Sequence, residues 1–208
     1  MSSIQKGRCG MILEYQFSQT KRIFSDKDLN NIIAMGESNL EDAKIDSTEQ
    51  SIQGHRSSSV AWFKRKQETE FIYKPVLNMI AGENKNNYWN YDYDAIEDLQ
   101  FTKYEGSKKQ HYDWHADQRS LPYDKNVDML LRGKIRKISF SVLLNEDYDG
   151  GNFEFETGLP HEKERNTILT PSTGCAIVFP SFMYHRVTPV TKGVRYSLVG
   201  WICGRPFR

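Results

Sequence analysis

The chain has 208 residues, enough for one domain with a sizeable hydrophobic core. Its 28 basic and 27 acidic side chains leave a formal net charge of +1, so no overall positive field favours a nucleic-acid partner. Three widely spaced cysteines, a start without a signal-peptide-like apolar segment and no apolar run of membrane-spanning length predict a cytoplasmic protein without a membrane partner.

The first predicted element is a helix. Ser25 and Asp28 form a capping-box pattern before apolar residues at i, i+3 and i+4 spacing, and Gly36 is a plausible stop. Residues 37–59, rich in Ser, Asp and Gln, are expected to form a long loop. Loops of this length are often functional lids, so this one is a candidate lid.

A short strand and a second helix follow. Residues 59–63 have the composition of a strand. Apolar residues between 71 and 80 recur with a helical period, with Pro75 expected near the first turn and Gly82 near the end. The N-terminal part therefore predicts two helices that support the remainder of the chain.

From residue 99 onward the apolar period changes from helical to strand-like. Alternation is clearest in residues 137–144, where Ile138, Phe140, Val142 and Leu144 share one face. Residues 118–134 lack a clear period and are a second candidate lid. Further strands are predicted at 99–104, around 112–117, and at 152–156, 167–170, 175–179 and 194–202.

Many short strands separated by Gly and Pro turns are typical of a sandwich or barrel. The predicted fold class is α+β with a mainly β core, a jelly roll with the N-terminal helices packed outside. We expect a single domain over residues 1–208, in which residues 1–98 support a jelly-roll core at 99–208 that holds the functional site.

His115 and Asp117 are the first candidate site residues. Alternate side chains of a strand point to the same face, so an imidazole and a carboxylate two residues apart could reach one ion. A second histidine, His185, follows another strand-like run, and Arg195 lies ten residues beyond it. Two histidines and one carboxylate with open coordination positions are the facial triad of non-haem Fe(II) oxygenases. An arginine paired with such a triad suggests a second ligand that is a carboxylate.

These motifs resemble those of the iron- and 2-oxoglutarate-dependent dioxygenases, whose core is a double-stranded β-helix. Within them they are most similar to the prolyl-4-hydroxylase-related group, which includes the bacterial PKHD-type hydroxylases. The resemblance covers about half of the chain and rests on Tyr104-x-Gly106, Tyr112-x-x-His115-x-Asp117, Leu143-Leu-Asn-x-x-Tyr148-x-Gly150-Gly151 with Phe155, Gly174 to Phe179, His185, Arg195-x-Ser197 and Trp201. Here Tyr104 stands further from the H-x-D motif than in the family pattern. Many collagen-type prolyl hydroxylases have Lys where this chain has Arg195, so collagen-like specificity does not follow.

The resemblance implies the chemistry. Fe(II) would be held by His115, Asp117 and His185, with 2-oxoglutarate as co-substrate, O2 as oxidant and ascorbate as a candidate reductant. The reaction would release succinate and carbon dioxide and hydroxylate a C–H bond. The distal carboxylate of 2-oxoglutarate would be bound by Arg195, because a planar guanidinium can bond it bidentately. Ser197, on the same strand face, and Tyr104 could add hydrogen bonds.

Each of these side chains has a plainer alternative. Arg195 could be a structural ion-pair partner, and Ser197 and Tyr104 could be ordinary barrel residues. Tyr112 and Trp114 stand at odd offsets from His115 and are expected to pack away from its face. His55 and His161, in polar segments, are expected to be exposed, and Arg56 to Ser58 are expected to be a simple strand entry rather than part of a substrate mouth.

The substrate is the open question. The family resemblance favours a protein or peptide, with proline as one possible target. The alternatives are an oxygenase acting on a free amino acid or small metabolite, and a cupin-like module that binds a metal or ligand without turnover. The oligomeric state does not follow from the sequence.

Overall fold

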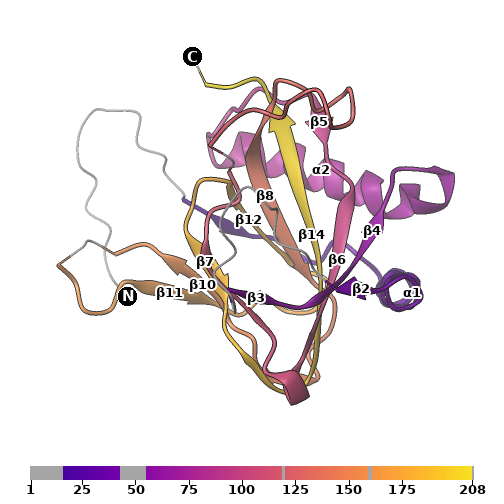
Figure 1. Cartoon of the computed structure of the whole chain (residues 1–208), viewed down its shortest axis with the longest axis vertical. Helices are drawn as coiled ribbons and strands as arrows, with labels where there is room; N and C mark the ends of the chain where they lie inside the picture. Colours follow the sequence, from indigo (N-terminus) through magenta and orange to yellow (C-terminus); the bar gives the residue numbers. More distant parts are fainter. Residues whose placement is uncertain (1–15, 43–54, 119, 159–160, 208) are drawn as a thin grey trace.

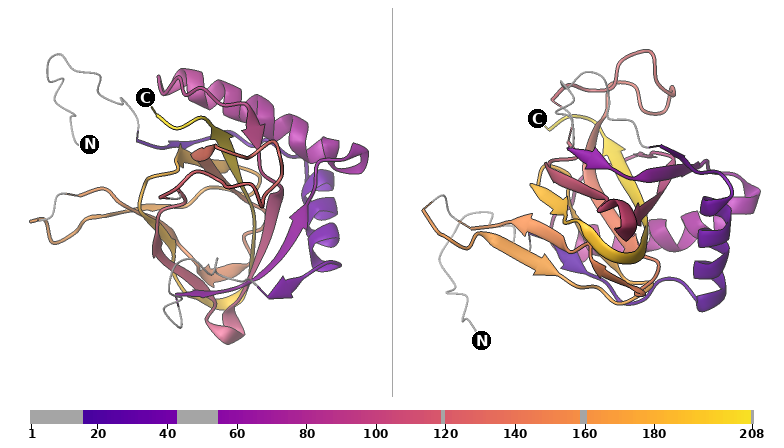
Figure 2. Two further views of the ribbon diagram at one scale, coloured as in Figure 1. Left: turned by 45° about the horizontal axis from the view of Figure 1, so that its top comes forward. Right: turned by 60° about the horizontal axis from the view of Figure 1, so that its bottom comes forward.

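The computed structural model describes residues 16–42, 55–118, 120–158 and 161–207. Two antiparallel β-sheets face each other around a common interior, and two helices lie outside them (Figures 1 and 2). This arrangement confirms the predicted α+β jelly roll with external helices. The predicted 118–134 lid stays irregular where it is described, whereas residues 1–15 lie outside the described part of the chain.

The larger sheet pairs in the order β1-β12-β8-β14-β6-β4-β2, with β5 and β9 also pairing with β14. The smaller sheet pairs in the order β11-β10-β13-β7-β3. The strands of the larger sheet are β1 (Ser18–Gln19), β2 (Glu41–Asp42), β4 (Ser59–Phe63), β5 (Ala95–Ile96), β6 (Leu99–Glu105), β8 (Ile135–Leu143), β9 (Tyr148–Gly150), β12 (Ala176–Pro180) and β14 (Val190–Gly204). Those of the smaller sheet are β3 (Arg56–Ser57), β7 (His111–His115), β10 (Phe153–Glu156), β11 (Asn166–Leu169) and β13 (His185–Val187).

The first helix, α1 (Asp26–Glu37), begins with the predicted capping box. The Ser25 side chain accepts from the Asp28 backbone N–H, and the Asp28 carboxylate accepts from the Ser25 N–H in return. Gly36 does not end the helix, contrary to expectation. It lies inside the last turn, where a β-carbon would overlap the ring of Phe101 on β6, so glycine allows α1 to approach the sheet closely.

The second helix, α2 (Glu70–Asn86), is longer than predicted and follows a short 3-10 turn at Gln67–Thr69. Pro75 is its sixth residue and so lies near the first turn, as expected. Gly82 lies in the interior of the helix with no atoms near the position of an added β-carbon. Neither α1 nor α2, nor any other described segment, forms a helix long and apolar enough to cross a membrane.

The two faces of the larger sheet carry different residues. The outer face joins the helices in one apolar core, to which α1 contributes Leu29 and Ile32. The inner face is buried but partly polar. Its polar residues include Gln100, Thr102, Ser139, Ser141, Arg195 and Ser197. Because buried polar groups are costly unless they are bonded, this interior has the composition of a binding site rather than of a packing core.

The predicted loop at residues 37–59 is only partly confirmed. Its residues 43–54 lie outside the described part of the chain. Its two ends are not loop: β2 pairs with β4, and β3 pairs with β7. The second pairing brings Arg56 opposite Tyr112, and so places the end of this segment beside the candidate site.

Candidate metal centre

His115, Asp117 and His185 converge as the sequence motif predicted. His115 is the last residue of β7, and His185 is the first residue of β13 and pairs with it. The Asp117 carboxylate lies 3.7 Å from His115 Nε2 and 3.6 Å from His185 Nε2. One ligand atom from each residue lies within 4.8 Å of the others, a spacing that could hold one metal ion.

The reason for the convergence differs from the predicted one. The strand ends at His115, and Asp117 lies beyond it in a bend. Alternation along one strand therefore does not bring Asp117 to the ion. The bend turns the chain back, so that the next residue, Gln118, donates its backbone N–H to the Ser181 carbonyl at 2.8 Å.

Both imidazoles are held in the same way. Nδ1 of His115 lies 2.7 Å from the Asp113 carbonyl, and Nδ1 of His185 lies 2.9 Å from the Met183 carbonyl. A carbonyl only accepts, so each Nδ1 carries the proton and donates it. Each Nε2 is then left with its lone pair directed toward Asp117, which is the tautomer that a metal ligand needs.

The electrostatics of the cluster favour the same donor set. Burial, reinforced by the neighbouring His185, lowers the pKa of His115 to about 3, so its imidazole is neutral at physiological pH. Burial by itself raises the pKa of Asp117, but His185, His115, Arg136 and a hydrogen bond from Ser139 together outweigh it and lower that pKa. A neutral imidazole and an ionised carboxylate at this spacing fit a divalent transition metal such as Fe(II).

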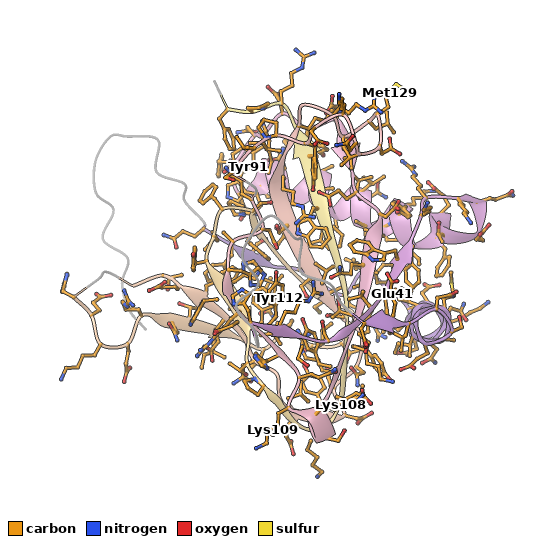
Figure 3. All side chains as sticks on the ribbon, in the orientation of Figure 1. Glu41, Tyr91, Lys108, Lys109, Tyr112 and Met129 are labelled. Carbon is orange, nitrogen blue, oxygen red and sulfur yellow. The ribbon has the colours of Figure 1, made fainter. Side chains whose placement is uncertain are left out.

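Tyr112 lies in the site, contrary to expectation. Its ring stacks on that of His115, with centroids 3.5 Å apart and 13° between the planes. The cause is an irregularity in the pairing of β7 and β13. His115 pairs with His185 and Tyr112 pairs with Val187, so an interval of three residues on β7 faces an interval of two on β13. One extra residue in β7 reverses the alternation, so residues three apart share a face. Figure 3 shows Tyr112 near the middle of the molecule.

Two other residues were also placed wrongly. His55 was expected to be exposed, but its ring is half-buried and lies edge-on to those of Tyr112 and His115, with centroids 5.6 and 6.3 Å away. Arg56 is more than a strand entry. Its guanidinium lies 4.7 Å over the Tyr112 ring and donates to Gln100 Oε1 at 2.9 Å. Trp114, by contrast, packs under the guanidinium of Arg186 as an ordinary packing residue would.

Arg195, Ser197 and Tyr104 lie together and are nearly completely buried. Arg195 and Tyr104 face each other across β14 and β6, with the guanidinium carbon 5.6 Å from the ring centroid. Arg195 Nη1 donates to Ser197 Oγ at 3.1 Å, whereas its Nε has no partner among the described residues. Gly151, with a positive φ of 62°, makes room for the arginine stem, because a β-carbon there would lie 2.8 Å from Arg195 Cδ.

No described carboxylate forms an ion pair with Arg195. The ion pairs of the described residues that do involve arginine join other partners. A buried cation without a counter-charge is costly, and a bound carboxylate would remove that cost. This orphaned donor fits the distal carboxylate of 2-oxoglutarate and argues against the alternative of a structural ion pair.

A second buried network stands beside the triad and was not anticipated. Arg136 donates to both carboxylate oxygens of Glu97, at 2.7 Å each, and its guanidinium lies 3.9 Å over the ring of Trp201. Tyr123 donates to the same carboxylate at 2.6 Å, and so anchors the loop that follows Asp117. The exposed side chains of that loop include Met129, labelled in Figure 3 at the end of the molecule that the loop occupies.

Comparison with known proteins identifies the family. Residues 99–203 match the sequence model of the 2OG-Fe(II) oxygenase superfamily. The chain belongs to this superfamily. A PKHD-type hydroxylase of Alteromonas mediterranea is 35% identical over 104 residues, which are 49% of this chain and 41% of that protein. The chain thus spans less than half the length of the curated relatives it matches.

Solved structures share the fold. A viral collagen prolyl hydroxylase from Paramecium bursaria Chlorella virus-1, in complex with 2-oxoglutarate, superposes with a TM-score of 0.67 at 20% identity, over 94% of this chain and 99% of that one. A prolyl hydroxylase from Trichoplax adhaerens, in complex with a hypoxia-inducible-factor peptide fragment, gives 0.65 at 16% identity, over 90% and 83%. Membership of the 2OG-Fe(II) oxygenase superfamily implies Fe(II), 2-oxoglutarate and O2 as cofactor and co-substrates, and the His-Asp-His cluster is compatible with iron.

Proposed function

We propose that this protein is an Fe(II)- and 2-oxoglutarate-dependent dioxygenase that hydroxylates a C–H bond of a polypeptide, with release of succinate and carbon dioxide. The observation that carries the proposal is the pairing of two features in one barrel. A two-histidine, one-carboxylate cluster has its free nitrogens directed at a common point, and a buried arginine beside it lacks a counter-charge.

In this proposal His115, Asp117 and His185 hold the iron. When bound, iron and 2-oxoglutarate activate O2 for oxidation of the C–H bond. The carbonyls of Asp113 and Met183 fix the imidazole orientation by accepting the Nδ1 protons. The stacked Tyr112 ring limits rotation of His115 and excludes water from one side of it.

Arg195 binds the distal carboxylate of 2-oxoglutarate, and Ser197 orients the guanidinium by accepting from Nη1. Tyr104 lies against the same guanidinium and contributes a hydroxyl, because burial raises the pKa of this phenol and keeps it protonated. These three residues come from two neighbouring strands of one sheet, which gives the rigidity that such an anchor needs.

A polypeptide substrate is supported by the relatives. The matched curated proteins are named PKHD-type hydroxylases, and the T. adhaerens neighbour binds a peptide fragment. Proline is the target we favour for the same reason. We also propose that residues 1–208 work as one domain, because the helices of the N-terminal part and the strands after residue 99 share one apolar core. A cytoplasmic location agrees with the free thiols of Cys175 and Cys203.

The test is an anaerobic titration of the purified protein with Fe(II) and then 2-oxoglutarate, in which the visible charge-transfer band of the chelate is recorded. We expect the band in the wild-type protein and its loss in His185→Ala. His161→Ala is the matched control, because His161 is an exposed histidine outside the cluster. A band of full intensity in His185→Ala would refute the triad. Tight binding of another metal with no band in the wild type would refute the oxygenase and favour a binding module.

A further inference from the structure

Four charged residues are at most 8% exposed in the described part of the chain: Glu97, Lys137, Glu154 and Arg195. The two glutamates are each paired with an arginine. The two cations are not, since no ion pair of the described residues includes Lys137 or Arg195. A buried charge without a counter-charge is costly. The proposed co-substrate supplies the missing charge at Arg195 but leaves Lys137 without one.

Within the described residues the Lys137 ammonium contacts one ring and no hydrogen-bond acceptor. Its Nζ lies 4.6 Å from the centroid of the Phe207 ring, and Phe207 is itself 50% exposed. A cation–π contact with a partly exposed ring is weak, so it offsets only a small part of the cost of removing an ammonium from water. Lys137 is therefore a buried donor that still lacks an acceptor.

An irregularity in β8 directs Lys137 away from the metal centre. Two consecutive residues of β14 pair with Ile138 and Arg136, which leaves Lys137 as an extra residue of β8 without a partner in the ladder. Such an extra residue bends the strand and changes the direction of its side chain. Arg136 lies over the ring of Trp201 in the barrel interior, whereas Lys137 lies against Phe207. The lysine therefore contacts neither the metal ligands nor the co-substrate anchor.

Lys137 lines a pocket of about 620 Å³, a size that suits a small-molecule ligand. Two of its walls are the rings of Tyr91 and Phe207, which meet edge to face with centroids 5.5 Å apart. Tyr91 packs against the outer apolar core, so the pocket lies outside the barrel interior. Figure 3 shows Tyr91 in the upper part of the molecule, apart from Tyr112 beside the metal centre. The rings offer a flat apolar surface next to the buried ammonium.

The charges of the pocket favour an anionic ligand. Lys137 and Arg205 both line it, and neither has an ion-pair partner among the described residues. Two carboxylates line it as well, those of Asp92 and Asp94, but Asp94 is already paired with Lys134 at 2.8 Å. Two unpaired cations thus stand against one unpaired carboxylate, and the more buried of the two cations gains most from a counter-charge.

We propose that this pocket is a second binding site, which takes a small organic anion with a flat apolar body. The acid group of the ligand, a carboxylate or a phosphate, accepts from Lys137 Nζ, and the apolar body lies against the rings of Tyr91 and Phe207. The site uses neither the iron nor 2-oxoglutarate. The inference therefore goes beyond the proposed function and does not rest on it.

The test is isothermal titration calorimetry of the protein with Mn(II) and saturating 2-oxoglutarate, so that the Arg195 anchor is filled before a probe is added. The probes are benzoate and phenyl phosphate, which carry the two acid groups on one kind of ring, and benzyl alcohol, their uncharged counterpart. At least one acid should bind about tenfold or more tighter than the alcohol, and its dissociation constant should rise about 10- to 150-fold in Lys137→Met, which corresponds to one hydrogen bond with a charged group.

Lys103→Met is the matched control. Lys103 is also mostly buried, but its ammonium is paired with Glu37 at 3.0 Å and does not line the pocket. This variant should unfold at a lower temperature than the wild type and bind the acids equally well. Lys137→Met should instead unfold at the same or a higher temperature when no probe is present, because no counter-charge among the described residues is lost.

Three results would overturn the inference: no binding of either acid, equal binding of acid and alcohol, or an acid affinity that Lys137→Met leaves unchanged. A probe-free Lys137→Met that unfolds many degrees earlier would overturn it too, since the ammonium would then have a structural partner. A preference for benzoate or for phenyl phosphate would support the site and identify its acid group. None of these results depends on the charge-transfer band of the iron chelate, which tests the proposed function separately.

Discussion

Replacing Arg195 with methionine should abolish the response to 2-oxoglutarate without destabilising the ligand-free protein. Arg195 is 3% exposed and bonds a single neutral group, the Ser197 hydroxyl. A buried charge without a counter-charge opposes folding, and a neutral, unbranched side chain of similar length can take its place. The variant should therefore unfold at the same or a higher temperature than the wild type when no ligand is present.

The expected effect on ligand binding is large. At a 2-oxoglutarate concentration of about 100 times the wild-type Kd, binding adds about 2.7 kcal/mol to the free energy of unfolding. For a chain of this size each kcal/mol raises Tm by about 2–4 °C, which gives a rise of about 5–11 °C. Loss of two charge-assisted hydrogen bonds, at about 1.5–3 kcal/mol each, weakens binding by roughly two to four orders of magnitude. At the same concentration the rise in Arg195→Met should be no more than about one degree.

Thermal unfolding with Mn(II), which replaces Fe(II) and avoids oxidation, measures both effects in one experiment. Arg186→Met is the matched control: Arg186 is bonded to Glu154 on β10, so this variant should unfold earlier but keep the full 2-oxoglutarate shift. An undiminished shift in Arg195→Met would contradict its role as the anchor. A ligand-free Arg195→Met that unfolds many degrees earlier would show that the guanidinium is structural.

Three further predictions concern stability, each measured by urea unfolding of the metal-free protein. Gly82→Ala should stabilise the protein by about 0.5–1 kcal/mol, because no atoms lie near this helical position. Gly36→Ala should destabilise it by about 1–3 kcal/mol, because the new β-carbon would overlap an aromatic ring. Equal effects of the two substitutions would contradict the packing of α1 on the sheet. Glu97→Ala should cost about 3–5 kcal/mol because it leaves the buried Arg136 unpaired, and a loss below 1 kcal/mol would show that water reaches this pair. Stability should fall as the pH drops from 6.5 toward about 3, because burial lowers the pKa of His115 and the unfolded chain takes up the proton first. His115→Gln should lose part of this pH dependence. A variant with the same pH profile as the wild type would contradict the assignment of the effect to His115.

The elements that could be predicted from the sequence depend on neighbouring residues. The capping box at Ser25 joins groups three residues apart, and the strand at Ser59–Phe63 has the predicted bounds. Gly36 was misread because its role is set by Phe101, which is distant in sequence and lies on strand β6. A glycine near the end of an apolar run can end a helix or allow the helix to pack closely on a sheet. The local sequence is the same in both cases, so it could not distinguish them.

In the site, too, features set by neighbouring residues could be predicted, and features set by distant strands could not. The His115 and Asp117 pair was predicted from spacing, and the spacing was informative even though the strand ends before Asp117. The place of Tyr112 could not be predicted, because the extra residue in β7 is defined only by its pairing with β13. A one-residue irregularity reverses every inside-or-outside assignment on one side of it. Arg56 was missed for a related reason, since its pairing with β7 crosses more than fifty residues of chain.

The three guanidinium groups of the barrel interior explain why one of them is left for a co-substrate. Arg136 is neutralised by the Glu97 carboxylate in a bidentate pair. Arg56 bonds neutral acceptors and lies on the face of Tyr112, which leaves it half-buried and partly solvated. Arg195 alone among these three is both fully buried and bonded to a single hydroxyl. In the proposed function, a diacid that enters this interior is stabilised most at Arg195, because Arg136 already has a counter-charge and Arg56 is partly solvated.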